Sequence, residues 1–483
     1  MLADVSDTND IWGMSGSEQA ARIRDGTLTS VAVVGAVLQR IEKVNPQINA
    51  YCTIDEDALD AARRADIALA SGQPVGLLHG VPVSVKDLIL TKGMRTTFGS
   101  QLFGDYLPSE DDVVVERLRN AGAIVIGKTN VPEFGYNSIT DNKVFGPSRN
   151  PWNTELTPGG SSGGAAAAVA AGVGSLALGS DGGGSIRIPS ALCGVFGLKP
   201  TYGLVPLYPG CRDPGLPGAS SWESLECIGP ITRSVSDAAL LLTVMAGGDD
   251  RDRHALAAPA VDYRAGLDRG LRGTRIAWSP DLGYAAVDPQ ARQLCEQAVE
   301  VFASQLDCDV EEASPGFGDP ADIFSATVAA DSDLRSLRRL RDERRDDLSD
   351  ALVALLDRDW TAEEFTDASI GRQRLYNHMH QFLTDYELLL TPTMPGPAFE
   401  IGASAPSQIG DVAVSAKTDW TAFVFPMNLT GLPAASIPVG FTDTGLPIGL
   451  QIVGRRLADA TVLRAAAAFE ALRPWAHRWP NLN

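Results

Sequence analysis

Thr157-Pro158-Gly159-Gly160-Ser161-Ser162-Gly163-Gly164 opens the most distinctive part of the chain, which closes with Asp181-Gly182-Gly183-Gly184-Ser185-Ile186-Arg187-Ile188-Pro189. The alanine-rich residues between these glycine clusters predict a buried helix of small residues that runs into a strand. Glycines allow successive backbone N–H groups to face one concavity, which can bind an anion or a developing oxyanion. Ser161 and Ser185 therefore lie in turns that are suited to chemistry on a carbonyl group.

Short apolar runs alternate with helical stretches around this segment. The runs are bounded by glycine or proline, as is typical of buried strands, and cover 81–85, 123–126, 388–392 and 448–453. A helix capped by Thr29-Ser30 is expected near the start and should end near Asn45-Pro46. Residues 311–385 are rich in charge and are expected to be helical. We therefore predict an α/β fold whose sheet is covered on both faces, in one domain with a helical insertion.

Composition and charge narrow the class of protein. The 483 residues include 40 Lys and Arg against 60 Asp and Glu, so the net charge of −20 argues against nucleic acid or an anionic membrane as a direct partner. The six cysteines form no metal-binding or disulfide pattern, and they are Cys52, Cys193, Cys211, Cys227, Cys295 and Cys308. The acidic first residues do not resemble a signal peptide. We expect reduced thiols, a cytoplasmic protein and no membrane span.

A serine nucleophile needs a base, and the chain offers two kinds. Of the five histidines only His79 lies near a glycine-rich strand end. A lysine can serve instead if burial makes its neutral amine accessible. Lys86 ends the apolar run 81–85 and fits this requirement, but Lys128 follows a similar apolar run. The residues alone leave the choice of base open.

Taken together, these motifs resemble the amidase signature family. The match includes the two serine clusters and the strand that carries Lys86, and it extends in order through Gly127-Lys128-Thr129-Asn130, Asn150-Pro151-Trp152-Asn153, Gly197-Leu198-Lys199-Pro200-Thr201, Gly229-Pro230-Ile231-Thr232-Arg233-Ser234-Val235 and Gly445-Leu446-Pro447-Ile448-Gly449-Leu450-Gln451. The resemblance is faint only over 311–385. It implies a large mixed twisted sheet in a single domain over 1–483, with N-terminal helices at about 15–65, a signature core at about 75–240 and a variable substrate region at about 311–385.

The resemblance also implies a catalytic apparatus. It assigns Ser185 as nucleophile, Ser161 as a bridging serine after a cis peptide bond, and Lys86 as base. Backbone N–H groups would form the oxyanion hole at Gly182, Gly183, Gly184 and Ser185. Ser162 and Asp181 would support the network. The expected reaction is hydrolysis of a carboxamide through an acyl-enzyme, without metal or cofactor, at a rate that rises between about pH 6 and 9 because the base must be neutral.

One position departs from the family pattern, since Gly182 stands where a non-glycine residue is usual. Three rival interpretations exist. Gly160-Ser161-Ser162-Gly163-Gly164 matches the G-x-S-x-G motif, which would make Ser162 the nucleophile of an α/β-hydrolase. The glutaminase subunit of a tRNA-dependent amidotransferase shares the core motifs, but its Tyr-Asp-Gly-x-Arg-Tyr-Gly string is absent here. A non-catalytic partner subunit would be expected to lack a member of the triad.

The substrate pocket is the least determined feature. The resemblance places it near Phe134, Gly135, Tyr136 and Asn137, near the loop 206–222 with Tyr208 and Pro209, and near the helices at 320–385. The loop is rich in proline and nearly uncharged, which favours an apolar wall. We therefore expect a small-molecule aryl-acyl amide or anilide, or an ester or carbamate, as substrate, and a monomer or homodimer.

Overall fold

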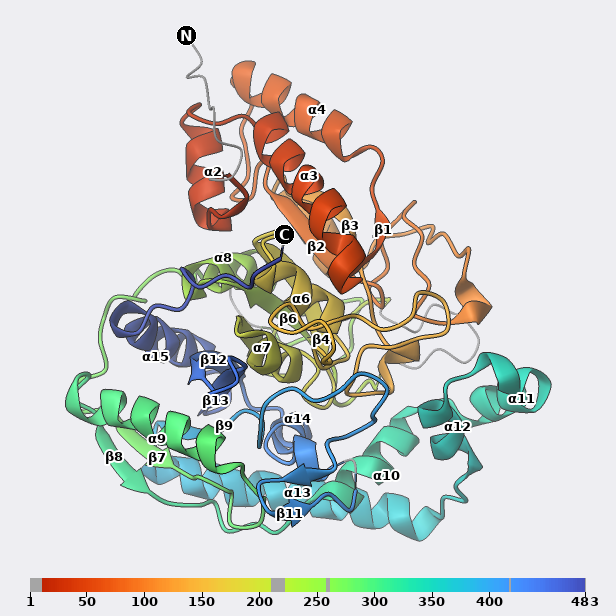
Figure 1. Cartoon of the computed structure of the whole chain (residues 1–483), viewed down its shortest axis with the longest axis vertical. Helices are drawn as coiled ribbons and strands as arrows, with labels where there is room; N and C mark the ends of the chain where they lie inside the picture. Colours follow the sequence, from red (N-terminus) through yellow and green to blue (C-terminus); the bar gives the residue numbers. More distant parts are fainter. Residues whose placement is uncertain (1–10, 210–221, 258–260, 417, 483) are drawn as a thin grey trace.

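A twisted mixed sheet runs through the protein (Figure 1), whose computed structural model describes residues 11–209, 222–257, 261–416 and 418–482. Within these residues the sheet has 11 strands in the order β1-β3-β2-β4-β6-β5-β12-β13-β9-β7-β8. The strands are β1 Tyr51–Ile54, β2 Pro82–Lys86, β3 Ile124–Thr129, β4 Leu176–Asp181, β5 Phe196–Lys199, β6 Cys227–Thr232, β7 Arg275–Trp278, β8 Asp309–Glu312, β9 Leu388–Pro392, β12 Ala434–Phe441 and β13 Pro447–Gly454. A separate small sheet pairs β10 Gln408–Ile409 with β11 Val412–Ala413.

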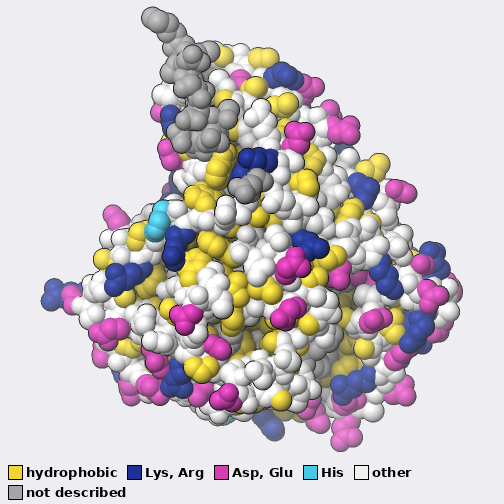
Figure 2. All heavy atoms as spheres, viewed as in Figure 1, with side chains coloured by type: hydrophobic (Ala, Val, Ile, Leu, Met, Phe, Trp, Pro, Cys, Tyr) yellow, Lys and Arg dark blue, Asp and Glu magenta, His cyan; other side chains and the backbone are white. Residues whose placement is uncertain are grey.

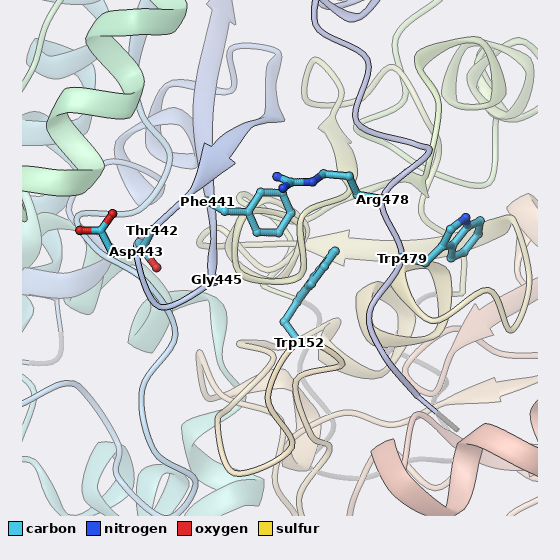
Figure 3. Close-up of a pocket in the computed structure, with 7 residues that line it drawn as sticks. All are labelled: Trp152, Phe441, Thr442, Asp443, Gly445, Arg478 and Trp479. Atoms are coloured by element: carbon cyan, nitrogen blue, oxygen red, sulfur yellow. The ribbon is translucent and has the colours of Figure 1, made fainter.

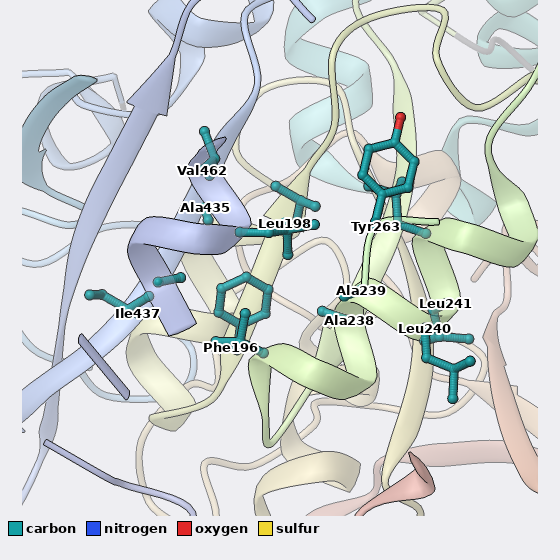
Figure 4. Packing of buried hydrophobic residues seen from close by; sticks show 14 of the residues in the cluster. Phe196, Leu198, Ala238, Ala239, Leu240, Leu241, Tyr263, Ala435, Ile437 and Val462 are labelled. Carbon is teal, nitrogen blue, oxygen red and sulfur yellow. The ribbon is translucent and has the colours of Figure 1, made fainter. Parts of the chain in front are cut away.

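Helices cover both faces of the large sheet. They are α2 Gly16–Arg24, α3 Ser30–Ile48, α4 Ala58–Ala70, α5 Val113–Asn120, α6 Gly163–Ala170, α7 Arg187–Cys193, α8 Val235–Met245, α9 Pro289–Ser304, α10 Ala321–Asp331, α11 Leu334–Arg344, α12 Asp350–Asp357, α13 Ala362–Asp385, α14 Phe425–Thr430 and α15 Asp459–Leu472. On one face of the sheet, a hydrophobic core packs α3, α4 and α6 against the strands. On the other face, a second hydrophobic core packs α2, α5, α8, α9 and α15 against the strands. Figure 4 shows part of the second core, where Phe196 and Leu198 of β5 meet the alanines of α8.

The predicted elements occur close to where the sequence places them. All eight residues of α6 are buried, and the chain continues into β4, as the small-residue pattern predicts. Thr29 caps α3 by accepting the N–H of Ala32 at 3.1 Å. The helix continues two residues past the predicted end near Pro46. Pro46 lies inside α3, which ends at Ile48 before Asn49 adopts the left-handed conformation.

The helices α10 to α13 lie together on one side of the molecule, beyond the sheet (Figure 1). They correspond to the predicted helical insertion, although its first predicted residues belong to β8. The α/β fold with a helical insertion is therefore confirmed, while the exact limits of the substrate region stay a prediction.

Charged and apolar side chains are distributed over the surface. Figure 2 shows acidic and basic side chains interspersed around one face, with hydrophobic side chains nearer its middle. In the described ranges no helix combines the length and apolarity that crossing a bilayer demands. Free thiols are present at Cys52, Cys193, Cys227, Cys295 and Cys308, whereas the prediction for Cys211 lies outside the described residues.

Candidate active site

Two neighbouring strands bring the candidate base to the site. β2 and β4 are parallel, with Val85 opposite Leu178, so their carboxyl ends meet at one edge of the sheet. Functional groups commonly gather at such an edge. Lys86 is the last residue of β2 and its side chain is fully buried, next to the end of β4 at Asp181.

The ammonium group of Lys86 is held by two serines. Its Nζ donates to Ser161 Oγ at 2.7 Å and lies 2.9 Å from Ser180 Oγ. A third bond, of 3.1 Å, runs to the carbonyl oxygen of Ser180. These contacts aim the amine of Lys86 at Ser161 and fix its position against β4.

The serine turn before α6 lies directly beside the turn that carries Ser185. The Gly160–Ser161 peptide bond is cis, as the resemblance implies. The N–H of Ser162 donates to the carbonyl oxygen of Ser185 at 3.1 Å, which joins the two turns. Ser162 Oγ donates to the carbonyl oxygen of Ser180 at 3.2 Å and accepts the Ser180 N–H at 3.3 Å. The Ser162 hydroxyl is therefore committed to the backbone of β4.

Ser185 opens into a cavity of about 370 Å³. Its side chain is nearly buried, so the cavity is its route to a substrate. Apolar and aromatic groups dominate the lining, which includes Tyr136, Trp222, Phe324, Val328, Leu355 and Trp360. A smaller polar set consists of Asn137, Ser138, Ser325, Arg358, Thr418 and Thr421. Such a site favours a largely apolar ligand that a few polar groups orient.

Backbone amides lie close to the cavity in the loop before Ser185, where Gly183 and Ser185 belong to the lining. In the part of the chain that the structure describes, the N–H groups of Gly182, Gly183 and Ser185 donate no hydrogen bond. The Gly184 N–H instead donates to Asp181 Oδ1 at 2.7 Å. The expectation that Gly184 contributes to the oxyanion hole is therefore corrected, because its proton is already engaged by a carboxylate.

Asp181 is the anchor of this loop. It is fully buried, and its carboxylate accepts two hydrogen bonds from Arg187, each of 2.9 Å, and one from Asn428 at 2.8 Å. Burial on its own would raise the pKa of Asp181, but the Arg187 guanidinium and its hydrogen bonds hold that pKa well below its usual range. Arg187 also donates to Gln451 Oε1 at 2.7 Å. Asp181 is therefore an ionised residue that holds the loop before Ser185 in place.

Comparisons with known proteins place the chain in a family. The family described as Amidase matches residues 32–463. The chain belongs to the amidase family. It is 39% identical to an acylamidase of Rhodococcus erythropolis, over 97% of each chain. It is 37% identical to a glutamyl-tRNA(Gln) amidotransferase subunit of Geobacter metallireducens, over 94% of this chain and 96% of that one.

A solved structure gives the same result. A bacterial aryl acylamidase of the amidase signature family superposes with a TM-score of 0.88 at 31% identity, covering 97% of this chain and 98% of that one. The resemblance seen in the sequence is confirmed, and the amidase is a hydrolase that acts on carbon–nitrogen bonds.

The two other candidate bases of the amidase lie elsewhere. Lys128 is buried and contacts Ile89 and Thr96, and its Nζ lies 3.9 Å from Asp87 Oδ1. Burial lowers the pKa of Lys128 to about 8, although Asp87 opposes this shift. The ring of His79 contacts the carbonyl oxygen of Ala65 at 3.0 Å. Neither side chain is bonded to Ser161 or Ser185 in the described residues.

The predicted pocket residues are only partly brought together in the amidase. Gly135, Tyr136 and Asn137 line the cavity at Ser185. Phe134 does not, because its ring packs in a cluster with Phe98 and Phe103 at centroid distances of 6.4 and 5.8 Å. The expectation for Phe134 is therefore wrong.

Tyr208 and Pro209 also lie away from the cavity. The Tyr208 carbonyl oxygen accepts the N–H of Val113 at 2.9 Å, and the Tyr208 ring lies 5.6 Å from the Arg251 guanidinium. These contacts hold Tyr208 against the start of α5, and neither Tyr208 nor Pro209 belongs to the described lining of the cavity. Residues 210–221 of the predicted loop lie outside the described residues.

A second cleft of the amidase, of about 570 Å³, shares no lining residue with the cavity at Ser185. Figure 3 shows the residues that line it. Its lining includes Trp152, Phe441 and Arg478, and the Arg478 guanidinium stacks 4.2 Å from the centre of the Phe441 ring. The cleft contains neither a candidate nucleophile nor a candidate base. The smaller cavity at Ser185 is therefore the better candidate for the active site.

Sequence reasoning did not identify Ser180 or Asn428. Trp222 and Phe324 line the cavity and fall within the predicted pocket regions 206–222 and 320–385, although neither residue was predicted individually. Ser180 stands within the quoted motif, beside Asp181, and its place at the end of a strand is a usable signal. Asn428 lies 247 residues from Asp181 and carries no local signal of its own.

Proposed function

We propose that this amidase is a stand-alone amidohydrolase that cleaves aryl-acyl amides or anilides, and related esters or carbamates, through Ser185, Ser161 and Lys86. The observation that carries the proposal is the 2.7 Å contact between Lys86 Nζ and Ser161 Oγ, in a turn bonded to the backbone of Ser185. A buried lysine in contact with a serine hydroxyl is suited to accept a proton from it when the amine is neutral.

The first half of the reaction forms an acyl-enzyme. Ser185 Oγ attacks the substrate carbonyl carbon, and its proton passes through Ser161 Oγ to neutral Lys86. The carbonyl oxygen becomes an oxyanion, which the N–H groups of Gly182, Gly183 and Ser185 stabilise. When the tetrahedral intermediate collapses, the C–N bond breaks and the proton returns by the same path to the leaving amine.

The second half regenerates the enzyme. Water attacks the acyl carbon, its proton passes through Ser161 to Lys86, and a second oxyanion forms in the same place. The ester bond to Ser185 then breaks, the carboxylic acid leaves, and Ser185 regains a proton. Asp181 and Arg187 act as positioning residues, because they hold the loop but do not face the cavity.

Two further features support the choice of substrate class. The cavity at Ser185 is lined largely by aromatic and aliphatic groups, which suits an aryl or apolar acyl group better than free glutamine. The similar proteins include an acylamidase and a bacterial aryl acylamidase. We further propose that the enzyme works in the cytoplasm as a monomer or homodimer on a small molecule, independently of nucleic acid.

The test compares purified wild-type protein with Ser185→Ala and Lys86→Ala, using a small acyl anilide as substrate. Exposed Ser304→Ala and Lys92→Ala serve as matched controls. We expect wild-type turnover, a fluorophosphonate adduct on Ser185, and losses of about a thousandfold or more in both site variants. No turnover and no adduct in folded wild-type protein would contradict the proposal.

The glutaminase subunit is the second candidate, because the amidotransferase subunit of Geobacter metallireducens is 37% identical to this chain. Glutamine hydrolysis at a rate equal to or above that of the anilide would favour it. The absence of the Tyr-Asp-Gly-x-Arg-Tyr-Gly string favours the stand-alone amidase.

A further inference from the structure

Trp222 lies against the backbone of the loop that precedes Ser185. A Cβ atom added at Gly182 would lie 2.6 Å from Trp222 Cε3, closer than real contacts of this kind allow. Gly182 does not adopt a positive φ, so its backbone conformation would accept a side chain. The space beside Gly182 is therefore restricted by the indole ring and not by the backbone. A side chain at position 182 would therefore collide with the Trp222 indole in its present position.

The ring of Phe324 restricts the space beside Gly183, as the Trp222 ring does beside Gly182. A Cβ atom added at Gly183 would lie 2.5 Å from Phe324 Cζ. The rings of Trp222 and Phe324 meet edge to face at 6.3 Å between centroids, and Tyr136 meets Trp222 edge to face at 5.1 Å. These three rings, which we call the aromatic wall, line the cavity into which Ser185 opens.

We propose that Trp222 is a specificity-determining residue, which occupies the space left by Gly182 and thereby limits the size of the substrate group that binds beside the oxyanion hole. The inference rests on the proposed function of Ser185. A residue with a side chain at position 182 would itself fill that space, whereas here the indole ring comes from a distant part of the sequence. The pair Gly182 and Trp222 therefore forms one steric unit.

The experiment measures kcat/KM for two series of amides. One series varies the acyl group from acetyl to a bulky aryl-acyl group on a constant aniline, and the other varies the amine on a constant acetyl group. For Trp222→Ala, we expect the kcat/KM of the bulky substrate, divided by that of the small substrate, to rise by about tenfold or more in one series. Trp222→Phe, which keeps a smaller ring, should give an intermediate ratio. Ratios within about twofold of wild type in both series would overturn the proposal.

A double-mutant comparison tests the steric unit itself. Gly182→Ala alone is expected to lower both melting temperature and kcat/KM, because the new Cβ meets the indole ring. Adding Trp222→Ala to Gly182→Ala should restore most of the lost melting temperature and kcat/KM. Adding Trp360→Ala instead removes another aromatic side chain of the same cavity and should restore neither quantity. The proposal would be contradicted if Trp222→Ala and Trp360→Ala restored the Gly182→Ala variant equally, or if Trp222→Ala restored nothing.

The melting temperatures keep the outcomes separate. They report the contact between positions 182 and 222 even in a protein without amidase activity. Absent wild-type turnover would contradict the proposed function, whereas unchanged selectivity in an active enzyme would contradict the role of Trp222 alone.

Discussion

Lys86 Nζ lies 2.7 Å from Ser161 Oγ, although 75 residues separate them in the chain. The contact joins the end of β2 to the turn before α6. Ser180 Oγ lies 2.9 Å from the same amine. The two serines therefore have different expected roles, because only Ser161 belongs to the turn bonded to Ser185.

Ser161→Ala should lower kcat by about a hundredfold to ten-thousandfold, since it removes the proposed proton path between Ser185 and Lys86. Ser180→Ala should lower kcat by about tenfold or less, because Lys86 keeps its bond to Ser161. Steady-state kinetics on an acyl anilide separates the two. An equal loss in both variants would indicate that Ser161 only positions the lysine.

Lys128→Met should affect stability more than catalysis. The change leaves the buried carboxylate of Asp87 without its cationic neighbour and should cost about 3–5 kcal/mol of unfolding free energy. Adding Asp87→Asn should recover part of this loss, as urea unfolding can measure. Lys86→Met should instead affect catalysis more than stability, with a large loss of kcat in protein that remains folded.

Asn428→Ala should destabilise the loop around Asp181. Its side-chain amide donates both to the carboxylate and to the main-chain carbonyl oxygen of Asp181, each at 2.8 Å. Loss of these bonds in a fully buried place should cost about 1–3 kcal/mol and should lower kcat together with stability. Asn428→Asp should be worse at neutral pH, because a second carboxylate would face Asp181. If Asn428→Asp proves as stable as wild type, Asp181 is not the ionised anchor described here.

Glu470→Gln should stabilise the protein in a pH-dependent way. Burial raises the pKa of Glu470 to about 7, against the opposing effect of the Val235 N–H that it accepts at 3.1 Å. Between about pH 4.5 and 7 the folded protein therefore holds a proton that the unfolded chain releases, so wild-type stability falls as pH rises through this window. A glutamine carries no such proton and still accepts the N–H.

The stability difference between Glu470→Gln and wild type should grow by about 2 kcal/mol from about pH 5 to about pH 7.5. Thermal or urea unfolding at the two values measures it. A constant difference would show that Glu470 ionises in the folded protein as it does in the unfolded chain.

Much of the fold and the close approach of Lys86, Ser161 and Ser185 at the candidate site could be predicted because their signals are local. The glycine clusters around Ser161 and Ser185 and the apolar run before Lys86 are continuous in sequence, and each one places a functional group at an element end. Lys128 is a genuine rival, since its preceding strand looks the same. Only the bonds made by each lysine distinguish the two.

The cavity could be predicted only in part, because its lining comes from separate segments. Tyr136 follows a short turn near Ser161, whereas Phe324 belongs to α10 and Thr421 to the segment before α14. Their meeting depends on tertiary packing, which no local pattern records. Phe134 shows the same limit, since its neighbours Gly135 and Tyr136 line the cavity while its own ring turns into the core.

The bond from Asn428 to Asp181 also bears on biosynthesis. The two residues are 247 positions apart, a length that a ribosome translates in about 12 to 50 s. During that interval a nascent chain already contains Lys86, Ser161 and Ser185 but lacks the Asn428 amide that bonds to Asp181. The bond from Asn428 to Asp181 can therefore form only after the ribosome has translated α14.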